Sequence, residues 1–313
     1  MRHQNIGPHN DSFFIHLPSN TIGDGKNTTG TFRVDLPYQL DLQGEWLVGL
    51  SSIIFCKSWP NLGPEQKPGD NSMVFEHKPT KELVVVRPPS RNYETIQMLL
   101  HALNKGIRQR GKELNPRLSL TASATVCSKV GDSGGLPPVH QTMTKDDEDD
   151  PTNPLMDAVL LYYDDTLQRV VLKLNEKRIV NSVHFGPLLQ YILGFSTKMD
   201  LSSLTQRKNT AEYPPDLNAG VYSLHVYCDI IHPQLIGDKV AHLLKVVPIR
   251  NDTKFGGVVY EAFNPIAFLP VVTRNIKTIN VQIRGDSGQK LDFQFGKTIL
   301  CLAFIRKPHR MLP

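Results

Sequence analysis

The sequence predicts an all-β protein, a sandwich or a barrel, with few helices. Many short segments alternate apolar and polar residues with a period of two, which is the pattern of half-buried strands. Turn-forming residues separate these segments, since the chain contains 22 glycines and 23 prolines. Only two segments repeat their apolar residues every three to four positions, as an amphipathic helix does.

The clearest strand candidate is the segment 32–36, in which three apolar residues alternate with Arg33 and Asp35. Because successive side chains of a strand point to opposite faces, we expect the three apolar residues in the core. The same period recurs in four further segments: 46–50, 170–174, 224–230 and 279–283. Residues 300–304 are apolar at every position, so we expect this strand to be covered on both faces.

The first helix is predicted over 93–110, with Asn92 as its N-terminal cap and Gly111 at its end. The second runs from about 186 to 193, and Gly194 suits its C-terminus. Two short amphipathic helices are expected to cover a face or an end of a sheet. A groove for a partner helix is the alternative.

Length and composition limit the class of protein. The chain has 313 residues, and 40% of them are hydrophobic and 21% charged, which is enough apolar content for a packed core. A chain of this length forms one large all-β or α/β domain, or two ordinary domains. No apolar run approaches the ~18 residues of a membrane helix. No secretory signal is expected at the N-terminus.

Four widely spaced cysteines without a CxxC pattern indicate reduced thiols in an intracellular protein. A disulfide framework or a zinc site is the alternative. No zinc-protease, hydrolase-elbow or dinucleotide-binding motif is present, so we expect no catalytic residue, no cofactor and no metal.

The formal net charge is +5, although residues 146–150 are five consecutive carboxylates. They lie in the long irregular stretch 129–154, which is typical of an exposed loop or insertion. The carboxylates would be suited to a divalent cation, but the glycine and terminal glutamate of an EF-hand are missing. We therefore predict a flexible, solvated acidic loop.

The opposite charge gathers at the C-terminus, where residues 306–310 include Arg306, Lys307 and Arg310. A solvated tail is the simplest interpretation of such a short basic run. Weak contact of this tail with nucleic acid is the functional alternative.

A serine-protease string is the most tempting catalytic motif. Residues 131–135 read Gly-Asp-Ser-Gly-Gly, the setting of the nucleophile in trypsin-like enzymes, with Ser133 at its centre. That chemistry needs a histidine to take the serine proton and a rigid oxyanion hole. No upstream histidine has the required setting, and the string falls in the predicted flexible loop. We expect no enzyme activity; a serine hydrolase that uses Ser133 remains the alternative from another class.

Two further motifs are weak. Residues 296–298 resemble the end of a phosphate-binding loop, but the required first glycine is Leu291, and a strand rather than a helix follows. The tripeptide Arg284-Gly285-Asp286 is of the integrin-binding type and lies between two strand patterns, which predicts a hairpin tip. It is the one candidate receptor-binding loop in the chain.

The two ends of the chain resemble a known family. The N-terminal strings are FFIHLPSN at 13–20, GEWLVGL at 44–50 and SWPN at 58–61. The C-terminal strings are YCDIIHPQLIGD at 227–238, LLKVVP at 243–248, DSG at 286–288 and FGK at 295–297. Their order and spacing resemble the minor capsid (penton) proteins of Polinton/Maverick elements and the related adintoviruses. The predicted helices, with LGF at 193–195, extend the resemblance over the middle of the chain.

This resemblance implies a viral structural protein: a single jelly-roll β-sandwich that forms homopentamers at icosahedral capsid vertices. The implied partners are other copies of itself and a double jelly-roll major capsid protein, without a membrane. The implied location is the virion, assembled in the host nucleus or cytoplasm. A jelly-roll major capsid protein is the structural alternative, although two full jelly rolls would strain the chain length.

The distribution of strands also predicts the domain organisation. Segments 1–60 and 213–313 supply enough strands for one jelly roll, so we expect them in the same barrel. Residues 61–212 hold both predicted helices and several strands. We expect them to form an inserted α+β subdomain that carries the acidic loop.

Overall fold

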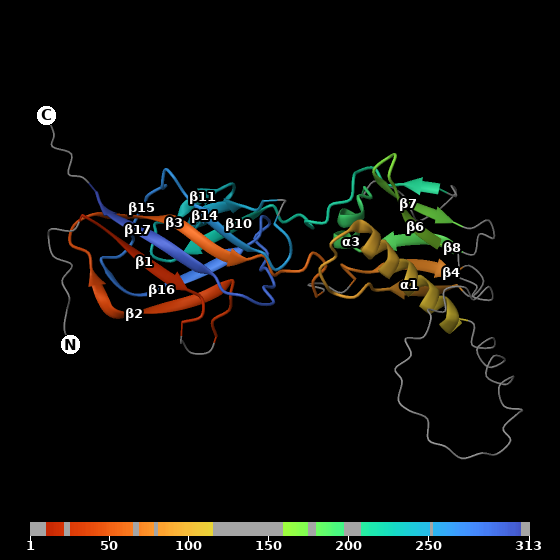
Figure 1. Cartoon of the computed structure of the whole chain (residues 1–313), viewed down its shortest axis with the longest axis horizontal. Helices are drawn as coiled ribbons and strands as arrows, with labels where there is room; N and C mark the ends of the chain where they lie inside the picture. The colour runs from red at the N-terminus through yellow and green to blue at the C-terminus, as the bar shows by residue number, and fades with distance from the viewer. Residues whose placement is uncertain are drawn as a thin grey trace, which may run out of the picture. The chain divides into compact units, whose positions relative to one another are not determined.

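The computed structural model describes residues 11–21, 26–64, 69–77, 81–114, 159–174, 180–196, 208–250 and 253–307. The chain divides into two compact units. One consists of Met1–Gly63 and Gly220–Pro313, and the other of Pro64–Ala219. Figure 1 shows the strands and helices of both units.

The first unit is built of antiparallel strands in two main sheets (Figure 1). Their bounds are Ser12–Pro18 (β1), Thr31–Asp41 (β2), Trp46–Cys56 (β3), Ser223–Cys228 (β10), Leu243–Pro248 (β13), Val258–Ala262 (β14), Asn275–Arg284 (β16) and Ile299–Arg306 (β17). Three shorter strands accompany them: Gln234–Ile236 (β11), Lys239–Ala241 (β12) and Leu269–Pro270 (β15). β11 pairs with β12 as a hairpin, and β15 pairs with β3.

The order of the strands identifies the fold. One sheet has the order β1-β17-β3-β14 and the other the order β13-β10-β16-β2. We number only the eight long strands of this unit, in chain order. The first sheet then has the order first, eighth, third and sixth, and the second sheet has the order fifth, fourth, seventh and second. Two antiparallel sheets in this order form a jelly roll, so the predicted fold class is confirmed. We call this part of the chain the jelly-roll unit.

The core lies between the two sheets, as the alternation predicts. In β2, Phe32 and Val34 are buried in the core, whereas Arg33 between them is exposed. In β17, Phe304 faces the core, and Ala303 on the other side of the strand is also buried. The expectation that this strand is covered on both faces is therefore confirmed.

The connections to the second unit leave the jelly-roll unit at one end. The chain leaves after β3 ends at Cys56 and returns just before β10 begins at Ser223. Both points lie at the end of the unit where β2 begins at Thr31. The C-terminal half of β16 shows this, because it pairs with β10 on one side and with Thr31 on the other. We call this the insertion end.

Strand β1 begins, and strand β17 ends, at the opposite end of the jelly-roll unit. Trp46, at the start of β3, pairs with Arg306 at the end of β17. Ser12, at the start of β1, pairs with Ile305. Both the entry into β1 and the exit from β17 therefore lie at what we call the terminal end.

The second unit is an α+β unit. Its strands are Met73–His77 (β4), Glu82–Val86 (β5), Val159–Asp164 (β6), Arg169–Leu174 (β7), Val180–Phe185 (β8) and Lys208–Thr210 (β9), and its described helices are Ile96–Leu114 (α1) and Pro187–Leu193 (α3). The strands form two antiparallel sheets, β5-β4-β8 and β6-β7-β9. Helix α1 contacts β5 of one sheet and β6 of the other.

Helix α1 exists where the apolar period predicts it, but both predicted ends are wrong. The Thr95 hydroxyl, not Asn92, accepts a hydrogen bond from a first-turn amide, that of Met98, at 3.3 Å. Tyr93 is buried before the helix and its hydroxyl donates to the carbonyl of Pro89, which holds this stretch out of the helix. At the other end Gly111 lies inside the helix, at a buried position that tolerates the missing side chain.

Asn104 on α1 ties the helix to an edge strand. Its side-chain amide donates to the carbonyl of Leu161 at 2.8 Å, and its carbonyl accepts from the Leu161 amide at 3.0 Å. The side chain thereby takes the place of a neighbouring strand along β6. The second predicted helix, α3, begins at Pro187, and Gly194 caps its end with φ of 81° as predicted.

Candidate functional site

The tripeptide Arg284-Gly285-Asp286 begins at Arg284, the last residue of β16, at the insertion end of the jelly-roll unit. The Asp286 carboxylate accepts hydrogen bonds from the backbone amides of Tyr222 at 3.1 Å and Ser223 at 2.7 Å. It also accepts one from the Ser223 hydroxyl at 3.1 Å. Asp286 therefore fixes the turn to the first residues of β10, directly where the chain returns from the inserted unit.

The arginine of the tripeptide is also engaged within the fold. Its guanidinium donates to the side-chain carbonyl of Gln282 at 3.0 Å and to the backbone carbonyl of Gly288 at 3.3 Å. Gly285 is buried, and a Cβ there would stand 2.6 Å from the side chain of Gln289. The tripeptide thus has a structural role in this turn, and receptor binding through it stays a prediction.

Asp286→Asn is expected to lower the free energy of unfolding by about 1–2 kcal/mol. The amide keeps the shape but replaces one acceptor oxygen with an NH₂ group, so a donor at the start of β10 loses its acceptor and faces another donor. Thermal and urea unfolding measure the effect. Asp238→Asn, in the turn of the β11–β12 hairpin, is the matched control and should change stability by less than about 0.5 kcal/mol. Equal stability of both variants would mean that water replaces the Asp286 contacts.

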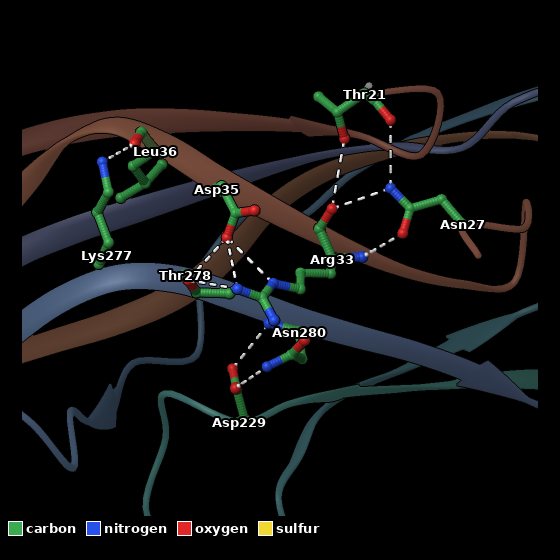
Figure 2. Close-up of polar contacts among 9 residues, drawn as sticks. All are labelled: Thr21, Asn27, Arg33, Asp35, Leu36, Asp229, Lys277, Thr278 and Asn280. Atoms are coloured by element: carbon green, nitrogen blue, oxygen red, sulfur yellow. Dashed lines mark hydrogen bonds and ion pairs between the residues drawn. The ribbon is translucent and has the colours of Figure 1, made fainter. Parts of the chain in front are cut away.

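Polar side chains on the outer face of β2 and β16 form separate hydrogen-bonded groups, which Figure 2 shows. Asp35 accepts from the Thr278 hydroxyl at 2.8 Å and from the Arg33 guanidinium at 3.0 Å. Asn280 binds both carboxylate oxygens of Asp229 through its backbone and side-chain N–H groups. Cross-strand pairs of this kind stabilise a sheet and hold its outer side chains in place.

The same contacts change the acidity of Asp35. The hydrogen bond from Thr278, and next the one from Arg33, lower the pKa of the Asp35 carboxyl below its ordinary value of 3.8. A carboxyl whose pKa is lowered by folding stabilises the fold above its unfolded pKa, and this contribution is lost as the pH falls through the folded pKa.

We therefore expect the difference in melting temperature between wild type and Asp35→Asn to be constant above about pH 5 and to shrink as the pH falls below about 4. Melting curves from pH 7 to pH 2 at low salt measure it. The difference shrinks because, at low pH, the Asp35 carboxylate of the wild type is protonated and loses the negative charge that the variant lacks at every pH. A difference that is independent of pH would contradict the role of the ionised carboxylate.

A hollow of about 330 Å³ lies at the terminal end. Its walls include Trp46, Leu47 and Val271, and its charged lining includes Arg274. Lys307, the last described residue, also lines it and forms an ion pair with Glu45 at 2.7 Å. The hollow therefore combines apolar walls with charged and polar side chains. The rest of the basic tail lies outside the described residues.

The described cysteines are Cys56, Cys228 and Cys301, and each is a buried free thiol. Burial raises the pKa of all three, and that of Cys228 to about 12. A raised pKa keeps sulfur in its unreactive thiol form near neutral pH. Within the described ranges no three His, Cys, Asp or Glu side chains gather in a way that suits a metal ion.

Of the other sequence motifs, one lies within the described residues and two lie outside them. Gly296 has φ of +88° and is followed by strand β17, which fits the turn that we expected in place of a phosphate-binding loop. Ser133 and the acidic run 146–150 lie outside the described residues. No helix in the described part of the chain is long and apolar enough to cross a membrane.

The strand order and the insertion define the class: a single jelly-roll protein with an α+β unit inserted between its third and fourth barrel strands. No protein-family model and no curated protein matches the sequence. Among solved structures, the crystal structure of selenomethionine-labelled mavirus penton protein aligns with 94% of this chain and 99% of its own, at 10% sequence identity and a TM-score of 0.46.

Proposed function

We propose that this chain is a penton, a minor capsid subunit that forms homopentamers at icosahedral vertices beside a double jelly-roll major capsid protein. The observation that carries the proposal is that the two ends of the jelly-roll unit differ. The inserted unit connects at one end, and both the entry into β1 and the exit from β17 lie at the other. A subunit in a capsid wall has one end toward the packaged DNA and the other toward the outside. Two unlike ends therefore fit such a subunit.

The sequence strings add independent support. GEWLVGL spans the turn before β3 and its first half, YCDIIHPQLIGD joins β10 to the β11–β12 hairpin, and LLKVVP is β13. All three therefore belong to the jelly-roll unit. Strings that resemble one family and fall on one folded unit support a shared architecture more than scattered matches would.

The direction of the subunit follows from the charges at its ends. Arg306 and Lys307 lie at the terminal end, where β17 leaves the sheet. We propose that this end faces the packaged DNA, because basic side chains bind phosphates, and that the inserted unit faces outwards. Arg306→Glu with Lys307→Glu should weaken retention of a DNA duplex in a salt-dependent way; a salt-independent effect would count against phosphate contact.

Co-expression with the major capsid protein tests the function itself. Particles should form with this chain at the five-fold vertices, visible by electron microscopy as pentameric density. The alternative of a major capsid protein predicts particles from this chain alone. In the described residues the second unit has the strand orders β5-β4-β8 and β6-β7-β9, which are not those of a second jelly roll.

We propose a structural rather than a catalytic role for the chain. The rival interpretation, a serine hydrolase that uses Ser133, predicts covalent labelling of Ser133 by a fluorophosphonate. It also predicts that Ser133→Ala abolishes a measured hydrolysis. We expect neither result, and we expect the variant to fold and assemble as wild type does.

A further inference from the structure

The hollow at the terminal end is enclosed by three segments that lie far apart in the sequence. Backbone hydrogen bonds of 2.9–3.1 Å hold these segments together, between Leu42 and Arg274, between Trp46 and Val271, and between Glu45 and Lys307. All six residues line the hollow. Its shape is therefore set by the paired backbone around it, which holds the lining side chains at defined places.

Part of the wall is apolar and fixed. Leu42 and Trp46 belong to the core of the jelly-roll unit. The Trp46 N–H donates to the Gln43 carbonyl at 3.0 Å, and the ring packs against Phe13, so the indole is held in one orientation. The volume of about 330 Å³ lies at the lower end of the range for small-molecule sites. The hollow therefore suits one small body, such as a nucleoside or a single side chain.

Positive charge exceeds negative charge around the hollow. Arg274 and Lys307 line it, and Glu45 is the one carboxylate residue among its described lining residues. Arg306 lies beside it, because a Cβ on the lining residue Gly44 would stand 3.4 Å from the Arg306 guanidinium. Three cations against one carboxylate favour an anionic ligand.

The fold itself does not use the charge of Arg274. This side chain is exposed, and within the described ranges it forms no hydrogen bond or ion pair. Lys307 is paired with Glu45 at 2.7 Å, but both side chains are more than half exposed, so the pair is weak. An arginine guanidinium presents its N–H groups as a fork that matches two phosphate oxygens. Arg274 is thus available to a phosphate, and Lys307 becomes available when Glu45 moves away.

The apolar wall and the cations together indicate what kind of ligand fits. A phosphate group alone would leave the wall unused. In a duplex the bases are paired and stacked, so only the phosphates would reach the cations. In an unpaired strand a base can leave the stack and enter a protein pocket while its phosphate stays at the rim.

We propose that the hollow at the terminal end binds one nucleotide of an unpaired DNA strand. The base or sugar lies against the apolar wall, and the phosphate binds to Arg274 and Lys307. Glu45 is an internal competitor, because the phosphate has to displace it from Lys307. This inference rests on the proposed function, which turns the terminal end toward the packaged DNA.

The first experiment measures fluorescence anisotropy of a short labelled single-stranded oligonucleotide, and of its duplex, with the full chain. The single strand should bind at least about fivefold more tightly than the duplex, the lower end of what one base gains on an aromatic side chain. Equal affinities would overturn the proposal. Arg274→Gln should weaken binding of the single strand about tenfold and reduce the slope of log K against log salt by about 0.7.

The matched control is Arg250→Gln, which removes the same charge. Arg250 follows β13 near the insertion end, where its guanidinium is paired with Glu261 at 3.1 Å. At about 0.15 M salt this variant should bind as wild type does, because charges more than about 8 Å apart are screened. The same loss in both variants would show that only net charge matters, and it would overturn the site. Arg274→Gln should keep the melting temperature of wild type.

A second pair of variants tests the competitor. Glu45→Gln should strengthen binding of the single strand about twofold to fivefold, because it releases Lys307 from a weak surface ion pair. Glu261→Gln removes the same charge beside Arg250 and should leave binding unchanged. Weaker binding by Glu45→Gln would contradict the assigned role of Glu45.

A third pair tests the hollow without a change of charge. Val272 lines the hollow and is 49% exposed, so Val272→Phe puts a larger side chain there. It should weaken binding of the single strand about fivefold or more and leave the duplex unaffected. Val258→Phe, at a 73% exposed valine of β14 near the insertion end, is the control and should change neither. Unchanged binding by Val272→Phe would mean that the hollow is not the site.

Competitors and particles separate the remaining outcomes. Deoxynucleoside monophosphate should displace the oligonucleotide at a lower concentration than inorganic phosphate or a polyglutamate peptide does. If either of the latter is equally effective, the cations recognise charge alone and the nucleotide site is wrong. Arg274→Gln should still enter particles with the major capsid protein. A wild-type chain that enters particles but does not bind the single strand would overturn this inference and leave the penton function standing.

Discussion

Trp46→Ala is expected to lower the free energy of unfolding of the jelly-roll unit by about 3–5 kcal/mol, the range for emptying a buried aromatic site. Trp46 is only 9% exposed and packs against Phe13, with ring centroids 5.4 Å apart. Its indole N–H donates to the carbonyl of Gln43 at 3.0 Å. The substitution therefore removes a large apolar surface and leaves one backbone acceptor without its donor.

Urea unfolding followed by circular dichroism measures this loss. Trp46→Phe is the matched control, because it keeps an aromatic ring but removes the N–H, and it should cost about 1–2 kcal/mol. A midpoint that hardly moves for the alanine variant would show that the ring contributes little to the core. Such a result would contradict the packing described for β3.

Gly186→Ala should destabilise the inserted unit by about 3 kcal/mol, at the upper end of the usual range for overpacking. Gly186 is the N-cap residue of α3, and its amide donates to the carbonyl of Ser72 at 2.7 Å. A Cβ at this position would stand 1.9 Å from the carbonyl oxygen of Gly69 and 2.4 Å from that of Asp70. Both are backbone atoms, so the helix and the turn would have to move apart.

Hydrogen exchange should locate this effect. The backbone amides of α3 after Pro187, and those of the turn around Asp70, are expected to exchange faster in Gly186→Ala, while the jelly-roll strands keep their protection. Gly63→Ala is the control, since its Cβ would meet only a side-chain atom of Pro60 at 3.6 Å. Unchanged exchange in α3 would falsify the close contact that forbids a side chain at Gly186.

The sequence determined the local structure well where one periodicity dominated. The alternation around Arg33 marked which residues of β2 enter the core, because a strand with one wet face must place its apolar residues on the other. Pro187 and Gly194 marked both ends of α3, because each residue restricts or permits a particular backbone angle. These features depend on neighbours in the chain and can be read from them.

Helix α1 shows where local signals were not enough. Asn92 was a reasonable cap by residue type, but burial of Tyr93 and its hydrogen bond to Pro89 hold that segment in another conformation. Gly111 was a reasonable helix end, but the helix continues past it. In both places packing against other elements outweighs an intrinsic preference of about 1 kcal/mol.

The candidate sites depended even more on distant residues. The tripeptide at 284–286 was predicted as a hairpin tip, yet only the fold brings Asp286 to the amide of Ser223, which is 63 residues away in sequence. Nothing in the local sequence around Asp286 indicates that partner. The carboxylate was therefore visible as a candidate from sequence, and its structural role was not.

Which side of β17 enters the core could not be recognised from the sequence. Residues 300–304 are apolar on both sides of the strand, so the period of two does not say which side enters the core. Only the pairing of β17 with β1 and β3 places Leu302 inside and Ala303 outside. Alternation is a property of one strand, whereas the identity of a face is a property of the whole sheet, and the sheet is assembled from strands that lie at opposite ends of the chain.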